Sequence, residues 1–253
     1  MKKKILKYSL ICMGLLISMA FLFNSRLETS AEDKKYIGAF LKEWKLADSV
    51  PGARRNFEAE IRFVSALQDS MINGITHSFN PYNVLGSVKY YYDTRKGYCY
   101  DRAALLEKTL RYAGFNTRHI FIYYDNNKQS LGFSDFIRKN SSHAMMEVKT
   151  SRGWMAVGTN CNWLGLETDG QLLDIFRMRD HIRGDSLRLQ KSGCVGVPFW
   201  LDVQHKGVYR IVYGLYSRHG QFLTSHPLET WMNKVGLRSP FPDYNLRELL
   251  YNF

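Results

Sequence analysis

A cysteine and a histidine stand where they could support nucleophilic catalysis. Cys99 follows Gly97-Tyr98 and comes directly before a helix-like run, and His143 lies 44 residues further along the chain. The partial positive charge at a helix N-terminus stabilises a thiolate. A neighbouring imidazole can accept the thiol proton and later protonate a leaving group, and a third polar group can hold that ring in place.

The elements predicted around these two residues would position them. In residues 100–113 the apolar residues recur at helical spacing, and Gly114 is a typical helix end. Three runs rich in β-branched, aromatic or alternating residues follow and predict strands, at residues 117–124, 142–150 and 154–158. Cys99 is therefore expected at a helix N-terminus and His143 near the start of a strand.

Two other interpretations of Cys99 remain open, a packed cysteine or half of a disulfide. The chain has four cysteines, and Cys12 lies in the N-terminal apolar segment. A bridge between Cys161 and Cys194 would leave Cys99 free. No Cys-x-x-Cys or Cys/His spacing typical of a metal site occurs, so we expect neither a metal nor a cofactor.

Other polar residues near the pair allow both functional and structural interpretations. His119 could compete as the base, but strand alternation favours a structural hydrogen bond. Asp101 and Arg102 could contact substrate, but capping and pairing in the first helical turn is the structural alternative, and an acidic residue there suits the helix dipole. Glu147 would share a strand face with His143, where it could line a cleft or pair with a surface base. Trp154 is expected in the core.

In their order and spacing these segments resemble the transglutaminase-like superfamily. The matching pieces are Gly97-Tyr98-Cys99, Gly114-Phe115, His143-Ala144-Met145-Met146-Glu147-Val148 and Trp154-Met155-Ala156-Val157, and the resemblance spans about residues 60–165. It implies an α+β, papain-like fold in which N-terminal helices, including the nucleophile helix, pack on an antiparallel sheet. It also implies Cys99 as nucleophile and His143 as base, acting on an amide bond.

One position departs from the family pattern. The acidic residue that orients the histidine in this family would fall on Gly158, which has no side chain to bind the imidazole. Asn160 is our candidate replacement, since an asparagine has this role in papain-like enzymes. Asn162 and Asp169 are weaker candidates. The alternative is an incomplete triad, which can cost several orders of magnitude in rate.

The N-terminus has the features of an export signal. Residues 1–7 are basic and residues 8–23 are uncharged and mostly apolar. We interpret residues 1–31 as either a signal peptide, cleaved near Thr29-Ser30-Ala31, or a signal anchor in the membrane. In both cases the remaining chain is expected outside the cytoplasm, in the periplasm or an equivalent compartment, and an uncleaved segment would hold it at the inner membrane.

No linker divides the rest, so residues 32–253 are expected to form one domain. A helical part over 34–95 contains two predicted helices, at residues 34–48 and 54–74, and a short element at 84–93 that we interpret as a helix, with a strand as the alternative. The catalytic core would span 96–165, and a C-terminal sheet extension would span 166–253. The extension is predicted to contain two strands within residues 208–224 and a short helix over the last eight residues.

The positive net charge of the chain indicates which classes of molecule it could bind. The chain carries +12, of which residues 1–31 contribute +4, so the exported part carries +8. This charge suits acidic glycans or phospholipid, and we expect no nucleic-acid partner for an exported protein. Two functions follow: a cysteine enzyme acting on protein, peptide or an envelope polymer, or a catalytically impaired module of the same fold that binds an envelope component and assists exopolysaccharide assembly.

Overall fold

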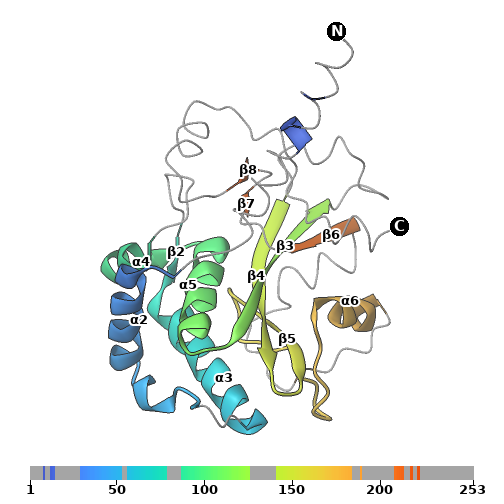
Figure 1. The fold of residues 1–253 in the computed structure, drawn as a ribbon. Helices are drawn as coiled ribbons and strands as arrows, with labels where there is room; N and C mark the ends of the chain where they lie inside the picture. The colour runs from blue at the N-terminus through green and yellow to red at the C-terminus, as the bar shows by residue number, and fades with distance from the viewer. Residues whose placement is uncertain are drawn as a thin grey trace.

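The chain folds into helices packed on an antiparallel sheet, as shown by a computed structural model (Figure 1). The structure describes residues 8, 12–14, 29–52, 56–78, 87–125, 141–183, 189, 208–213, 217–218 and 221–222. This arrangement confirms the predicted α+β class and the helix-on-sheet architecture.

Four helices form the N-terminal half of the fold. They are α2 (Ala31–Glu43), α3 (Phe57–Gly74), α4 (Val88–Thr94) and α5 (Cys99–Tyr112), and a short 3-10 helix, η1 (Ala47–Ser49), follows α2. Three of them begin at side chains that cap exposed backbone N–H groups: Ser30, Asn56 and Ser87. The three predicted N-terminal helices are thus confirmed, with the first divided into α2 and η1.

The central sheet has the strand order β5-β4-β3-β6, and all of its neighbours are antiparallel. Its strands are β3 (Asn116–Asp125), β4 (Ser141–Thr150), β5 (Gly153–Val157) and β6 (Val208–Tyr213). The register pairs Ile122 with His143 and Phe121 with Ala144. The three central strands appear where the sequence predicted them.

Short strands and one further helix complete the described elements. The short strands are β1 (Thr76–His77), β2 (Lys96–Gly97), β7 (Ser217–Arg218) and β8 (Gln221–Phe222), and the helix is α6 (Ile175–Arg183). The parallel pair β1 and β2 brings His77 beside Gly97, two residues before Cys99. The sequence did not predict α6.

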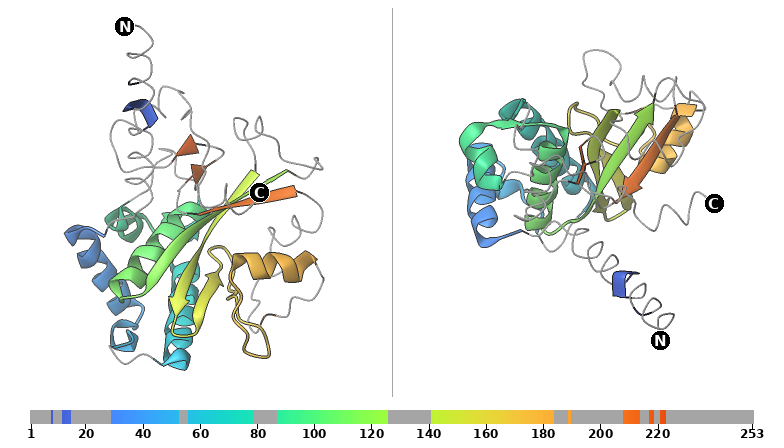
Figure 2. Two further views of the ribbon diagram at one scale, coloured as in Figure 1. Left: turned by 45° about the vertical axis from the view of Figure 1, so that its right-hand side comes forward. Right: turned by 90° about the horizontal axis from the view of Figure 1, so that it is seen from above.

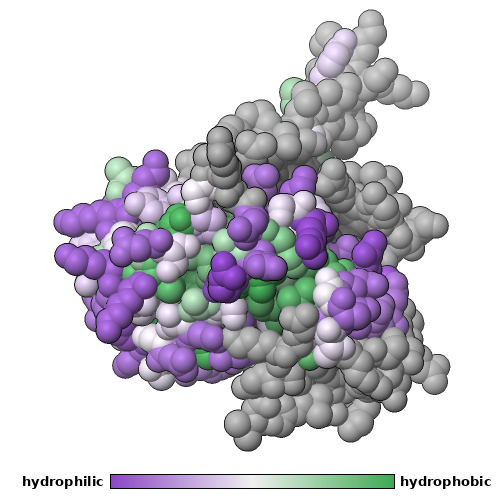
Figure 3. Space-filling view, turned by 90° about the horizontal axis from the view of Figure 1, so that it is seen from below, coloured by the Kyte–Doolittle hydropathy of each residue, from purple (hydrophilic) through white to green (hydrophobic). Residues whose placement is uncertain are grey.

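Helices cover both faces of the sheet. Two views show α2 to α5 on one side and α6 on the other (Figure 2). Strand alternation explains the two cores: Met146 and Val148 join the helices α2 to α5, while Met145 packs with Ile175 and Met178 of α6. From below, hydrophobic side chains show in the middle of the described face, with hydrophilic side chains lying among them and on its left side (Figure 3).

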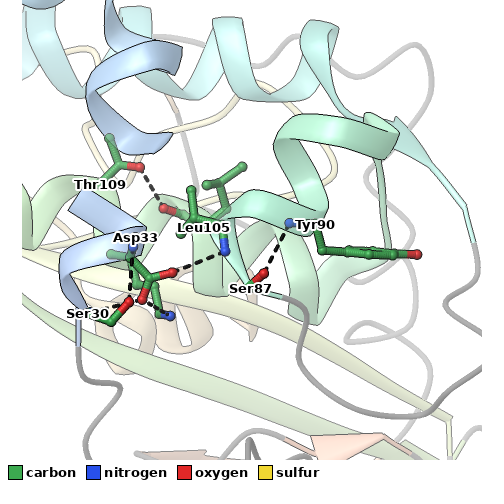
Figure 4. Close-up of polar contacts among 8 residues, drawn as sticks. Ser30, Asp33, Ser87, Tyr90, Leu105 and Thr109 are labelled. Carbon is green, nitrogen blue, oxygen red and sulfur yellow. Dashed lines mark hydrogen bonds and ion pairs between the residues drawn. The ribbon is translucent and has the colours of Figure 1, made fainter. Parts of the chain in front are cut away.

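A buried carboxylate ties three helices together. Asp33 is 4% exposed and accepts hydrogen bonds from the backbone N–H groups of Ser30 and Val88 and from Lys108 Nζ (Figure 4). Burial alone would raise the pKa of Asp33, but the Lys108 bond and charge and these N–H donors lower it. Asp33 therefore fixes the start of α2 against α4 and α5.

Several sequence predictions fall on residues outside this description. They include nearly all of residues 1–28, part of the 208–224 region and the C-terminal helix, so the signal or anchor and the domain limits stay predictions. Within the described part, no helix has the length and apolar character needed to cross a membrane. In the 208–224 region β6 and the small β7–β8 hairpin are present, with Arg218 in β7.

Candidate functional site

Cys99 is the first residue of α5, and Tyr98 occupies the cap position before it. The helix is held there by Asp101, whose carboxylate accepts hydrogen bonds from the Tyr98 N–H at 2.9 Å and the Tyr91 hydroxyl at 2.8 Å. Asp101 thus has the capping role that suits an acidic residue in the first turn. Helix α5 packs on β4 and β3, so the cysteine lies against the sheet.

The sulfur of Cys99 faces backbone N–H groups. The donors are Ala144, which directly follows His143 on β4, and the first residues of α5 itself, Cys99 and Tyr100. The side chain is 6% exposed and packs with Phe121 and Ala144. Burial raises the pKa of the Cys99 thiol to about 11, because these N–H donors do not outweigh the loss of solvent and the nearby Asp101 charge.

His143 lies on β4 opposite Ile122 and is 5% exposed. Burial, with the charge of His77 as a smaller contribution, lowers the pKa of His143 to about 4. The ring is therefore neutral at pH 7, and the same shift makes it a weaker base than an ordinary imidazole. The structure brings Cys99 to the backbone of the residue after His143, and at neutral pH the two side chains are an uncharged thiol and an uncharged imidazole.

No side chain orients the His143 ring through Nε2 in the described part of the chain. This atom is buried and has no hydrogen-bond partner there. Asn160, the predicted orienting residue, instead has its amide oxygen 3.5 Å from Arg102 Nη1. The third-residue role of Asn160 remains a prediction, and it requires the amide to leave Arg102.

The position of the missing acid is filled by packing. A Cβ atom at Gly158 would lie 2.6 Å from the Cys161 carbonyl oxygen and 2.6 Å from Trp163 Nε1. Gln68 of α3 holds this loop by donating to the carbonyl oxygens of Gly158 and Trp163, each at 2.8 Å. The departure from the family pattern is thus accompanied by a tryptophan that occupies the space of a side chain at position 158.

Three residues near the site were missed by sequence reasoning. Thr159 donates its hydroxyl to the Ala144 carbonyl at 2.6 Å and so joins the loop after β5 to the strand of His143. Gln68 could have been noticed as an amide next to Leu67 on the apolar side of α3. Trp163 gave no signal, because its closeness to Gly158 depends on the turn between them.

Glu147, His119 and Trp154 are buried or packed against other side chains. Glu147 is fully buried and pairs with Arg118, as one alternative predicted, and it also accepts the Ile175 N–H at the start of α6. Burial, together with the charges of His143 and Arg111, holds the pKa of His119 well below its usual value. Trp154 lies under the Arg118 guanidinium rather than deep in the core.

The cysteines separate into two groups. Cys161 is disulfide-bonded, whereas Cys99 and Cys12 are free. Cys194, its predicted partner, lies outside the described residues. Within the described ranges no cluster of three or more His, Cys, Asp or Glu side chains could hold a metal ion.

The shifted pKa values of His143 and Cys99 predict how the stability of the protein depends on pH. Unfolded His143 takes up a proton as pH falls below 6.5, but the folded ring does so only near 4, so stability is lost as pH falls through this range. The Cys99 thiol acts in the opposite direction: unfolded it ionises near 9.0 and folded near 11, so stability is lost as pH rises from 9 to 11. Stability should be greatest between these limits.

Urea unfolding at pH 7 and pH 5 tests the acid side. We expect His143→Gln to remove about 2 kcal/mol of the stability loss that wild type shows between these two pH values. The carboxylates contribute equally to both proteins and cancel in the comparison, and His119 stays buried in the variant. Equal losses in the two proteins would contradict a buried, neutral His143.

Comparisons with known proteins give a family model and solved structures of low identity. Residues 46–159 match the family model of the transglutaminase-like superfamily. No curated protein matches the chain. Among solved structures, a candidate cysteine protease from Cytophaga hutchinsonii is 16% identical with a TM-score of 0.37, and the match covers 76% of this chain and 50% of that one.

A second solved structure, a candidate protease from Parabacteroides distasonis ATCC 8503, is 11% identical with a TM-score of 0.35. The match covers 62% of this chain and 30% of that protein. The chain therefore spans at most half the length of these two structures. The segment that matches the family model contains the start of α5, the strand of His143 and the Trp154 strand, and residues 46–159 are thus similar to the transglutaminase-like superfamily.

Proposed function

We propose that the chain is an exported transglutaminase-like cysteine enzyme that acts on amide bonds. Cys99 is the nucleophile, His143 is the general base, and Asn160 orients the ring once its amide turns from Arg102. The observation that carries this proposal is the place of Cys99, at the N-terminus of α5 with its sulfur facing the N–H of the residue after His143.

The chemistry follows from the two neutral groups. As the Cys99 sulfur bonds to the amide carbonyl carbon, its proton passes to His143, and the imidazolium then protonates the departing amine. Water or a second amine attacks the thioester and returns the enzyme to its starting state, giving hydrolysis or a cross-link. Backbone N–H groups at the start of α5 are the donors available to the oxyanion.

Export and the class of substrate belong to the same proposal. The disulfide at Cys161 supports an oxidising compartment, since cytosolic proteins rarely keep such bonds. An exported enzyme of this class would meet proteins, peptides and envelope polymers, and the +8 charge of residues after 31 would favour acidic ones. If residues 1–31 are not cleaved, the membrane is a further partner.

A second candidate function is supported by the lack of space for a side chain at position 158. With Trp163 beside Gly158 and no partner for His143 Nε2 among the described residues, the fold could instead be a non-catalytic module that binds an acidic envelope glycan. Its test is retention on immobilised acidic polysaccharides at physiological salt. Loss of all retention under that condition would remove its main support.

Labelling with iodoacetamide at pH 7 separates the two functions. A thiol of pKa about 11 is only about 0.01% thiolate at pH 7, against about 1% for an ordinary thiol of pKa 9.0. Unassisted, native Cys99 would thus react about 100-fold more slowly than in urea-denatured protein. We expect native Cys99 to react faster than the denatured control, with Cys99→Ala as the blank, because His143 takes the proton. Native labelling no faster than the control would exclude the enzyme.

A further inference from the structure

Arg102 is a buried cation directly behind the proposed nucleophile. It lies three residues after Cys99 on α5, on the same side of the helix, and is 5% exposed. Its Nη1 donates to the Thr159 carbonyl at 3.4 Å and the Asn160 amide oxygen at 3.5 Å, and its Nη2 donates to the Ile75 carbonyl. All of these acceptors are uncharged.

No carboxylate neutralises this guanidinium in the described part of the chain. The nearest acid in sequence, Asp101, has its two oxygens bonded to Tyr91 and Tyr98 instead. Arg102 Nε is buried and has no hydrogen-bond partner among the described residues. Burying a cation without a counter-charge is unfavourable, so its place beside a thiol that must ionise during catalysis calls for a functional explanation.

We propose that Arg102 is a positioning residue whose charge stabilises the Cys99 thiolate while His143 holds the proton. The inference rests on the proposed function and adds what compensates for the missing acid. In the usual triad a carboxylate stabilises the imidazolium. Here the thiolate of Cys99, not the imidazolium, is stabilised. The Arg102 guanidinium does this, because it stays protonated.

Electrostatics around the site agree with this role. Burial lowers the pKa of Arg102, and the nearby Cys99 thiolate raises it. The Arg102 charge also contributes to the lowered pKa of His77. The titratable and charged groups of the described residues beside Cys99 are Asp101, Arg102 and Tyr100 on α5 and Tyr98 before it. His77 on β1 lies against Tyr98, and His119 on β3 and His143 on β4 belong to the strands that pack against α5.

The test measures the iodoacetamide labelling rate of Cys99 from pH 6 to pH 11 in Arg102→Gln, Arg102→Lys and wild type. We expect Arg102→Gln to lower the rate at pH 7 by about tenfold and to move the alkaline rise of the profile upward. Arg102→Lys keeps the charge and should stay within about threefold of wild type. Urea unfolding reports whether each variant is folded.

Arg111→Gln is the matched control. Arg111 lies on the same helix, twelve residues after Cys99 or about 18 Å along the axis, and pairs with Glu107. Its loss should leave labelling unchanged, since the separation exceeds the screening length. If wild type labels no faster than denatured protein, the proposed function fails. If wild type labels fast but Arg102→Gln matches it, only this inference fails.

The lysine variant also decides the case if Arg102→Gln does not fold. A rate near wild type for Arg102→Lys supports a role for the charge. A tenfold loss in folded Arg102→Lys would overturn it and leave Arg102 as a bond between the Ile75 and Thr159 carbonyls only.

Discussion

Replacing His143 with alanine is expected to slow labelling of Cys99 at pH 7 by about 100-fold or more. The reason is the pair of pKa values at the site. With a thiol pKa near 11 and an imidazole pKa near 4, neither group is charged at pH 7. The unassisted thiolate fraction is only about 0.01%, so fast labelling requires the thiol proton to move to a base as the bond forms.

The same measurement at high pH distinguishes base catalysis from damage to the fold. Above pH 11 solvent removes the thiol proton, so His143→Ala and wild type should label within about threefold of one another. A variant that merely distorted the site would be slow at every pH. A ratio that stays near 100 at pH 11 would therefore reject the base role of His143.

His181→Ala is the control for this experiment. His181 lies on α6, on the far side of the sheet, and its Nδ1 is 3.1 Å from a Glu167 carboxylate oxygen. It is a half-buried histidine in a polar pair, so its removal changes the histidine count without touching Cys99. We expect Cys99 in His181→Ala to be labelled at the wild-type rate both at pH 7 and above pH 11.

Sequence periodicity was enough to predict the elements that carry the pair. The helix after Cys99 and the strand of His143 are set by local apolar spacing, and Gly114 ends the helix with a positive φ of 82° that glycine adopts readily. The contact between α5 and β4 was expected from the family resemblance, not from local pattern. The helix and the strand themselves depend on residues close together in the chain, where pattern is informative.

Contacts between distant loops could not be predicted in this way. Arg102 was expected to cap or pair in the first turn, but its bonds run to Ile75 and Thr159, which are 27 and 57 residues away. Likewise Asn160 was placed opposite His143 because it follows Gly158, whereas its amide contacts Arg102. Side-chain direction in a loop depends on the closed fold.

Gly158→Asp, which restores the acid of the family pattern, is expected to destabilise the protein by about 3 kcal/mol and not to accelerate labelling of Cys99. Any side chain at this position begins with a Cβ atom 2.6 Å from the Cys161 carbonyl oxygen and from Trp163 Nε1. The neighbours are fixed, because Gln68 bonds the carbonyls of Gly158 and Trp163 and Cys161 is disulfide-bonded.

Urea unfolding of three glycine variants measures this effect. Gly158→Ala should lose nearly as much stability as Gly158→Asp, because the clash begins at Cβ and does not need the carboxylate. Gly38→Ala on α2 is the control: nothing lies within 4 Å of its Cβ position, and alanine should stabilise this helix by about 0.5–1 kcal/mol. Wild-type stability in Gly158→Asp would contradict the packing.

The double variant Gly158→Asp with Trp163→Ala then tests whether the indole alone excludes an acid. Removing the indole from the 1% exposed Trp163 costs about 3–5 kcal/mol by itself, so the coupling between the two changes is the informative quantity. The Cys161 carbonyl still lies 2.6 Å from the new Cβ. We therefore expect relief of only part of the Gly158→Asp penalty, since backbone as well as tryptophan occupies this space. The proposed mechanism therefore has to operate without an acid at position 158.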